Sequence, residues 1–318
     1  MARRQKLFLV LRIGASAVML ALLLSRVHIS SLLPKDEAAA VPWLLAGLVV
    51  WLVAIVLATI RWQRVVTALE LPAELPPLLS HSFAGMFVAN FLPSTIGGDV
   101  LRVSRLTATN GQGPASFASV VLERLTGFLV LPMITLTALF LHPDLLQLGN
   151  ASRIALLLSV GTLVALAGIL LLAGNARLGR RLADNQSWLR FVGAVHLGFD
   201  RIRHHPGAVA GVILTAVAYQ LTIVLAAWMA TQALDINVGW EAVMAFIPVV
   251  AMAQVLPISV NGLGLREGAL VLLLSPLGVA TGQAVALGLL LYGMNLVISL
   301  LGAPAFAVGA RPAIRATA

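Results

Sequence analysis

The sequence predicts an all-α polytopic membrane protein built from two inverted-topology repeats. Three observations lead to this fold class. Hydrophobic residues make up 60% of the 318 residues and charged residues only 10%, whereas soluble domains contain about 45–50% apolar residues. The apolar residues form runs long enough to cross a bilayer. A motif at residues 89–102 (the first motif) also recurs at 253–266 (the second motif).

Six apolar runs are long enough to cross a bilayer as helices, which takes roughly 20 residues. They lie at 7–27, 41–60, 117–141, 153–174, 208–231 and 281–308. Two shorter apolar segments, 76–92 and 241–256, lead into Pro93 and Pro257. A proline stops a helix there because it lacks the N–H and its ring clashes with the preceding turn. We therefore expect two re-entrant hairpins or two broken full spans, at 76–107 and 241–276.

Basic residues indicate the orientation, because cytoplasmic loops carry an excess of lysine and arginine. Arg3, Arg4 and Lys6 precede the first span. The loop 175–206 contains six more arginines, and Arg61, Arg64, Arg311 and Arg315 fall on the same side if 76–107 re-enters from the cytoplasm. The prediction is that both termini are cytoplasmic.

The two motifs relate the halves of the chain to each other. Ala89 aligns with Ala253, a shift of 253 − 89 = 164 residues, and six aligned positions are identical: Ala, Leu, Pro, Gly, Leu and Arg. With the orientation above, the first motif opens from the cytoplasm and the second from outside. The chain is thus predicted to be one membrane domain, 1–318, with inverted halves of about 1–150 and 151–318. Such repeats support alternating access, although a duplication can also be purely structural.

Arg102 and Arg266 end the two motifs and are the first candidates for function. An arginine at membrane depth needs a partner, an aqueous cavity or an anionic ligand. The glycines before them free backbone N–H groups and allow close approach, which with a helix start makes an anion pocket; they are Gly97, Gly98, Gly262 and Gly264, with Asn261 beside them. The alternative is that both arginines snorkel to the interface. Topology does not account for Arg266, because basic residues are scarce on its side.

Four further charged residues lie in or near the apolar segments. They are Asp99, Glu267, and the neighbours Glu123 and Arg124. They are expected to form internal ion pairs or to carry protons for coupling. Glu123 and Arg124 point about 100° apart in a helix, so they are not natural partners of each other.

Asn90 and Gln254 occupy matching positions just before the two breaks. Their amides are expected either to satisfy freed backbone groups or to contact the substrate. Cysteine is absent, the histidines are dispersed and no nucleophile motif occurs, so no metal, no cofactor and no catalytic residue is predicted. Basic residues are scattered singly without stacking aromatics, which excludes a nucleic-acid partner.

At these motifs the chain resembles the transmembrane flippase-like family related to the membrane region of lysylphosphatidylglycerol synthases. The likeness rests on Asn-Phe-Leu-Pro-x-x-x-Gly-Gly-Asp-x-x-Arg at 90–102, on Glu123-Arg124, and on Leu-Pro-Ile-Ser-x-Asn-Gly-Leu-Gly-x-Arg-Glu-Gly at 256–268. The resemblance implies a bacterial or archaeal plasma-membrane protein that moves lipids, or lipid-linked intermediates, between leaflets. The chain ends at Ala318 without the aminoacyl-transferase domain of bifunctional members, so no synthase activity is expected. The family usually has Gly where Asn261 stands, and Asn is the next-best residue for a positive φ.

The sequence therefore predicts a lipid translocase rather than an enzyme. An anionic headgroup or a polyprenyl phosphate would be held by Arg102, Arg266 and loop amides, while the tail stays in the bilayer. Two alternatives remain open. One is a membrane enzyme acting on lipid phosphates through Asp99, Glu123 or Glu267. The other is a non-transporting partner of a lipid synthase or glycosyltransferase.

Overall fold

The fold is all-helical throughout the described residues of the computed structural model. These residues are 37–91, 97–174, 193–198, 206–255, 259 and 261–309, together with Val18, Ala21 and Ser25. The α-helices are α2 (Glu37–Ala68), α3 (Leu75–Phe91), α4 (Gly97–Asn110), α5 (Gly113–Leu141), α6 (Asn150–Gly174), α9 (Pro206–Ala233), α10 (Trp240–Ala253), α11 (Leu265–Leu274), α12 (Thr281–Leu300) and α13 (Gly302–Ala307). Two 3-10 helices, η2 (Pro143–Gln147) and η3 (Ser275–Leu277), lie in the connections.

In the described part of the chain, five helices are long and apolar enough to cross a membrane: α2, α5, α6, α9 and α12. They overlie five of the six predicted spans, and the remaining one, 7–27, lies outside the described residues. The predicted span 281–308 is wrong at its end, because α12 stops at Leu300 and α13 follows. Gly302 begins α13 against the backbone of Phe83 in α3, where a Cβ would overlap the Phe83 carbonyl group.

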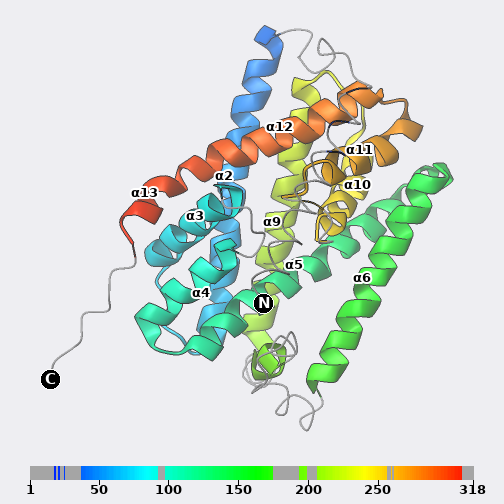
Figure 1. The fold of residues 1–318 in the computed structure, drawn as a ribbon. Coiled ribbons are helices and arrows are strands. Elements are labelled where there is room, and N and C mark those ends of the chain that lie inside the picture. The colour runs from blue at the N-terminus through cyan, green and yellow to red at the C-terminus, as the bar shows by residue number, and fades with distance from the viewer. Residues whose placement is uncertain are drawn as a thin grey trace, which may run out of the picture.

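The two short apolar segments form α3 and α10, and each is followed by a second short helix, α4 or α11. The links with Pro93 and Pro257 lie outside the described residues. Helices α3 and α4 pack side by side (Figure 1). Their contact is close because Gly85 and Gly98 meet there: a Cβ on Gly85 would lie 2.9 Å from the Gly98 carbonyl oxygen.

Helix bounds in the second half follow those in the first at the motif spacing. Adding 164 to 37–68 gives 201–232, against 206–233 for α9, and adding it to 75–91 gives 239–255, against 240–253 for α10. The packing follows the same relation. Helix α2 packs along α9, α5 packs on α10, and α12 and α13 pack on α3 (Figure 1). The last long helix of the first half, α5, therefore packs on the short helix α10 of the second half. In the same way, α12 and α13 of the second half pack on the short helix α3 of the first.

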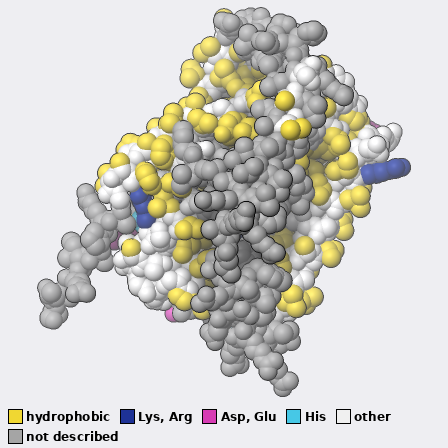
Figure 2. Space-filling view, in the orientation of Figure 1, with side chains coloured by type: hydrophobic (Ala, Val, Ile, Leu, Met, Phe, Trp, Pro, Cys, Tyr) yellow, Lys and Arg dark blue, Asp and Glu magenta, His cyan; other side chains and the backbone are white. Residues whose placement is uncertain are grey.

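Apolar side chains fill the interior and also cover much of the surface. Figure 2 shows one face, on which hydrophobic side chains spread along α12 and α6. Leu157, Val164 and Leu171 of α6 are among the exposed ones. In the interior, α5 contributes Val121 to one hydrophobic cluster and Leu131 to another. The charged site described below meets α5 between these two positions.

Candidate functional site

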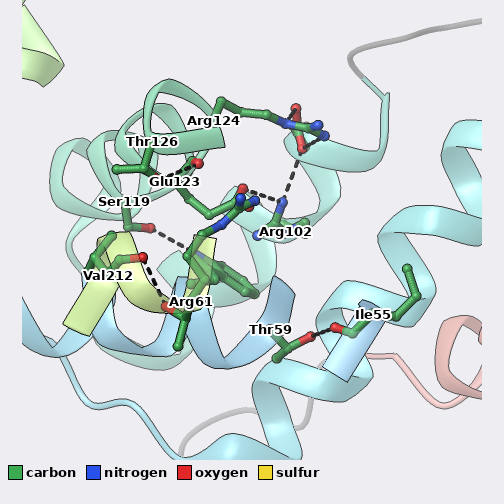
Figure 3. A network of polar contacts seen from close by, with 12 residues as sticks. Ile55, Thr59, Arg61, Arg102, Ser119, Glu123, Arg124, Thr126 and Val212 are labelled. Atoms are coloured by element: carbon green, nitrogen blue, oxygen red, sulfur yellow. Dashed lines mark hydrogen bonds and ion pairs between the residues drawn. The ribbon is translucent and has the colours of Figure 1, made fainter. Parts of the chain in front are cut away.

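A cavity of about 330 Å³ opens between α2, α3, α4, α5, α9 and α12. Part of its lining is apolar, including Trp51 and Ile55 of α2 and Met86 of α3. The remainder is polar and carries five charged side chains: Arg61, Asp99, Arg102, Glu123 and Arg124. These residues come from α2, α4 and α5, and Figure 3 shows how four of the side chains converge. The cavity is therefore amphipathic.

Arg102 reaches the cavity because α4 starts at Gly97 and runs close to α3. A Cβ on Gly85 would lie 3.0 Å from Arg102 Cγ, so the arginine stem lies across that glycine. Its guanidinium carbon lies 4.1 Å from the ring centre of Trp62, a cation–π distance. The Arg102 side chain is only 11% exposed. It therefore lies within the helix packing instead of extending to solvent.

Glu123 connects three helices. Its carboxylate is 3% exposed and accepts hydrogen bonds from Nη2 of Arg61 in α2 and, at 3.3 Å, from Nη1 of Arg102 in α4. Arg124 has a different partner, Asp99, to which its Nε and Nη2 donate at 3.1 and 2.9 Å. Glu123 and Arg124 thus diverge, as neighbours in a helix must. The five charges form one continuous network, because Arg102 also lies 3.4 Å from Asp99.

The network leaves hydrogen-bonding capacity beside the cavity. Three buried nitrogens, Nε and Nη1 of Arg61 and Nε of Arg102, have no hydrogen-bond partner among the described residues. Arg61 also lies over the ring of Tyr219, with its guanidinium carbon 4.8 Å from the ring centre. Three arginines and two carboxylates sum to 3 − 2 = +1 in the lining. A net positive charge with free buried N–H donors is suited to an anion, because such donors are costly to leave unmatched.

Sequence reasoning missed Arg61 as a site residue and used it as a marker of the end of the second span. Helix α2 continues to Ala68, so Arg61 lies inside the helix and is 4% exposed. A signal was present, because Glu123 in an apolar run needs a cationic partner. The sequence did not indicate which arginine that would be. Trp62, Tyr219 and Asn295 were missed as well.

Arg266 in the second motif has different surroundings. Its guanidinium donates to Gln254 Oε1 at 3.1 and 3.2 Å, to the Asn261 carbonyl at 2.9 Å and to the Gly288 carbonyl at 3.3 Å. It is 8% exposed and its guanidinium carbon lies 5.3 Å from the ring centre of Tyr292. Arg266 is therefore held by neutral oxygens of its own half. The described residues that line the cavity with Arg102 do not include Arg266.

The backbone of the second motif explains its residue types. Asn261, Gly262 and Gly264 all have positive φ, at 50°, 76° and 80°, which favours glycine and tolerates asparagine. Gly264 precedes α11, and its N–H donates to Glu267 Oε2 at 2.6 Å. Glu267 is fully buried, and its Oε1 has no hydrogen-bond partner among the described residues. The Glu267 carboxylate thus caps the start of α11.

Amide side chains connect the two halves. Asn261 Nδ2 donates to the carbonyl of Ala89, the first residue of the first motif, at 3.1 Å. Asn90, whose side chain lines the cavity, accepts from Asn295 Nδ2 at 3.0 Å. Gln254, the counterpart of Asn90, instead accepts from Arg266. The motifs therefore touch through amides, while the charge is concentrated in the first half.

Most of the predicted site residues fall into two groups. The residues that line the cavity are Asn90, Gly98, Asp99, Arg102, Glu123 and Arg124. Gly97 begins α4 and does not line the cavity. The second group surrounds the start of α11: Gln254 at the end of α10, Asn261, Gly262 and Gly264 in the turn, and Arg266 and Glu267 in the first turn of α11. Within the described part of the chain, no three histidine, aspartate or glutamate side chains are grouped to hold a metal ion.

A comparison with protein families finds a match over most of the chain. The family model for the lysylphosphatidylglycerol synthase transmembrane region matches residues 9–302. The chain belongs to this family. The match confirms the resemblance seen in the motifs and, with the apolar helices, identifies a multi-pass membrane protein related to lipid handling. The family describes the membrane region of the synthases and not their aminoacyl-transferase domain. Neither the curated proteins nor the solved structures include a significant match.

Proposed function

We propose that this protein is a lipid translocase that moves a lipid with an anionic, phosphate-bearing headgroup between leaflets. The observation that carries the proposal is the network of five charged side chains in an amphipathic cavity between apolar helices. Arginine forks match phosphate oxygens geometrically, and the net charge of the lining favours an anion. The family's relation to lipid handling supports a lipid as the source of that phosphate.

The size of the cavity favours binding of the headgroup alone. Ligand sites for small molecules measure about 300–1,000 Å³, and this cavity, at about 330 Å³, is at the lower end. The part of the lining that α2 contributes is apolar at Trp51, Ile55 and Ala58 and charged at Arg61. The headgroup would occupy the charged end while the acyl or prenyl tail stays in the bilayer.

Alternating access would move the headgroup across the membrane. In this proposal the halves are inverted repeats, the α3–α4 hairpin re-enters from the cytoplasm and the α10–α11 hairpin from the other side. Both termini are cytoplasmic, in the plasma membrane of a bacterium or archaeon. The charge asymmetry of the loops and the exchanged packing of α5 on α10 and α13 on α3 support this arrangement. Arg102 would contact the headgroup, while Arg266 would hold the second motif in shape.

The alternative enzyme has less support from the geometry. Asp99 and Glu123, two of its acid–base candidates, are both paired with arginines, and Glu267 caps a helix. A carboxylate committed to a guanidinium is a poor general base. A non-transporting partner of a lipid synthase would have no need of the charged cavity.

Proteoliposomes provide the test. Leaflet exchange of fluorescent phosphatidylglycerol is expected to rise with the purified protein, and exchange of phosphatidylcholine to rise much less. Arg102→Gln is expected to lower phosphatidylglycerol exchange about tenfold, because a lost hydrogen bond to a charged group costs about 1.5–3 kcal/mol. Arg153→Gln is the control, since Arg153 is exposed at the start of α6. Exchange that does not change when the protein is added contradicts the proposal, and chemically altered lipid favours the enzyme.

A further inference from the structure

Glu123 has an unusual position for a structural carboxylate. It is 3% exposed, lines the cavity and accepts hydrogen bonds from two arginines, Arg61 and Arg102 (Figure 3). Both of these arginines have further buried nitrogens without a hydrogen-bond partner among the described residues. A carboxylate in this place occupies the donors that a phosphate entering the cavity would need.

Arg102 has two carboxylate partners, and neither contact is short. Its Nη1 lies 3.3 Å from Glu123 and 3.4 Å from Asp99. Strong hydrogen bonds between guanidinium and carboxylate groups measure about 2.7–2.9 Å. Arg102 is therefore held loosely by two carboxylates, and a phosphate can replace either contact without breaking a strong one. Arg61 would stay paired and keep Glu123 in place.

The second half shows that the fold does not need a carboxylate at this point of the long helix. Position 123 + 164 = 287 is Leu287, which is fully buried in α12. Position 61 + 164 = 225 is a leucine as well, so the ion pair between Arg61 and Glu123 corresponds to an apolar pair of residues. Replacing buried ion pairs by apolar residues is often neutral or stabilising. The charge at Glu123 therefore serves the cavity rather than the helix packing.

The net positive charge of the lining sets how much negative charge a bound ligand can have before the occupied cavity becomes negative. With both carboxylates present the lining sums to +1, which one phosphodiester charge neutralises. A phosphomonoester carries a charge of about −1.5 to −2 at pH 7, which is more than the net charge of the lining neutralises. Without the Glu123 carboxylate the sum is 3 − 1 = +2, which suits the phosphomonoester.

We propose that Glu123 is the specificity-determining residue of the cavity. Its carboxylate pairs with Arg61 and Arg102, and Arg102 leaves it to bind the headgroup phosphate. The remaining negative charge of Glu123 limits the site to a ligand with one negative charge. The inference rests on the proposed function, because it assigns the substrate class of that same site. It predicts that removing the carboxylate strengthens lipid binding, whereas a purely structural Glu123 predicts lower stability and unchanged preference.

Native mass spectrometry of the full chain with phosphatidylglycerol and phosphatidic acid measures this preference. The wild type is expected to bind phosphatidylglycerol more tightly. Glu123→Gln is expected to bind phosphatidic acid on the order of tenfold more tightly and to reverse the preference. Glu74→Gln is the matched control, because it also removes one negative charge but lies exposed just before α3. This control is expected to keep the wild-type ratio.

The outcomes separate this inference from the proposed function. Suppose that the wild type binds phosphatidylglycerol, but Glu123→Gln binds phosphatidic acid no more tightly and keeps the wild-type ratio of the two affinities. This result overturns the role of Glu123 and leaves the proposed function standing. A wild type that binds neither lipid overturns the translocase proposal together with this inference. If Glu123→Gln does not fold, Asp99→Asn tests the same charge argument, since Asp99 is the second carboxylate of the cavity and its side chain is 23% exposed. Its preference is expected to shift in the same direction, and an unshifted ratio contradicts the inference.

Discussion

The two motifs contain the same arginine in the same place, yet the structure gives the two side chains different surroundings. Arg102 lies in a charged cavity with two carboxylates and an unpaired nitrogen. Arg266 is enclosed by an amide and two backbone carbonyls. Both reach toward the same part of the following long helix, since Arg102 contacts Glu123 and Arg266 contacts Gly288, whose counterpart is residue 288 − 164 = 124.

The partners around the arginine account for the difference. Each charged partner in the first half has a neutral counterpart 164 residues later: Arg61 and Leu225, Asp99 and Leu263, Glu123 and Leu287, Arg124 and Gly288. The helix bounds therefore correspond in the two halves, whereas these four charges do not. The comparison teaches that the same arginine of a recurring motif can have charged partners in one copy and neutral oxygens in the other.

The largest expected effect comes from making the same substitution in both motifs. Arg266→Gln leaves the Gln254 amide oxygen and the buried carbonyl groups of Asn261 and Gly288 without their donor, so it is expected to cost about 3–5 kcal/mol of stability. Arg102→Gln is expected to cost only about 1 kcal/mol, because Glu123 keeps Arg61 and Asp99 keeps Arg124. Thermal unfolding in detergent measures both. Equal losses of stability for the two variants would show that the two arginines contribute alike to the fold.

A glycine comparison is expected to give the next largest effect. Gly98→Ala brings a Cβ onto the carbonyl oxygen of Gly85, backbone against backbone, and is expected to cost about 1–3 kcal/mol. Gly268→Ala in α11 meets no atom within 4 Å and is expected to stabilise by about 0.5–1 kcal/mol, because alanine is the better helix former. Their apparent Tm values should move in opposite directions. A Gly98→Ala variant that is as stable as the wild type would mean that α3 and α4 do not approach as closely as described.

Asn261 tests the contact between the motifs. Asn261→Gly keeps the positive φ but loses the hydrogen bond to the Ala89 carbonyl, at an expected cost of about 1 kcal/mol. Asn261→Ala loses the same bond and adds strain at φ 50°, for about 1–2 kcal/mol more. If the glycine variant is the less stable of the two in thermal unfolding, the positive φ at this position is not the constraint.

The smallest effect is expected at the rim of the cavity. The Arg124 side chain is 52% exposed and pairs with Asp99, and exposed pairs contribute only about 0.2–1 kcal/mol. Arg124→Gln should therefore leave the apparent Tm nearly unchanged. It also lowers the charge of the lining from +1 to 3 − 2 − 1 = 0, so phosphatidylglycerol binding should weaken. Unchanged lipid binding would show that the net charge of the lining does not control affinity.

Much of the fold could be predicted from the sequence, because bilayer-spanning helices are recognised by the length and apolarity of their segments. Five predicted spans coincide with α2, α5, α6, α9 and α12. The short helices α3 and α10 lie within two residues of their predicted bounds at 76 and 241 and end before the prolines. The end of α12 was wrong. Pro304 has no N–H to donate to the Leu300 carbonyl, and Gly302 packs against Phe83. The proline is visible in the sequence, whereas the contact of Gly302 joins residues far apart in the chain and leaves no mark in local hydropathy.

The sequence by itself determined the membrane class, the family, the recurrence of the motif and the two arginines, since each depends on composition or on residues close together in the chain. Only the tertiary structure decided the partners of those arginines. Arg61, read as a topology marker, turned out to be the buried partner of Glu123, and Arg266 to be bound to its own turn. Ion pairing depends on distances between helices, and a repeat that preserves the backbone does not preserve the charges around it.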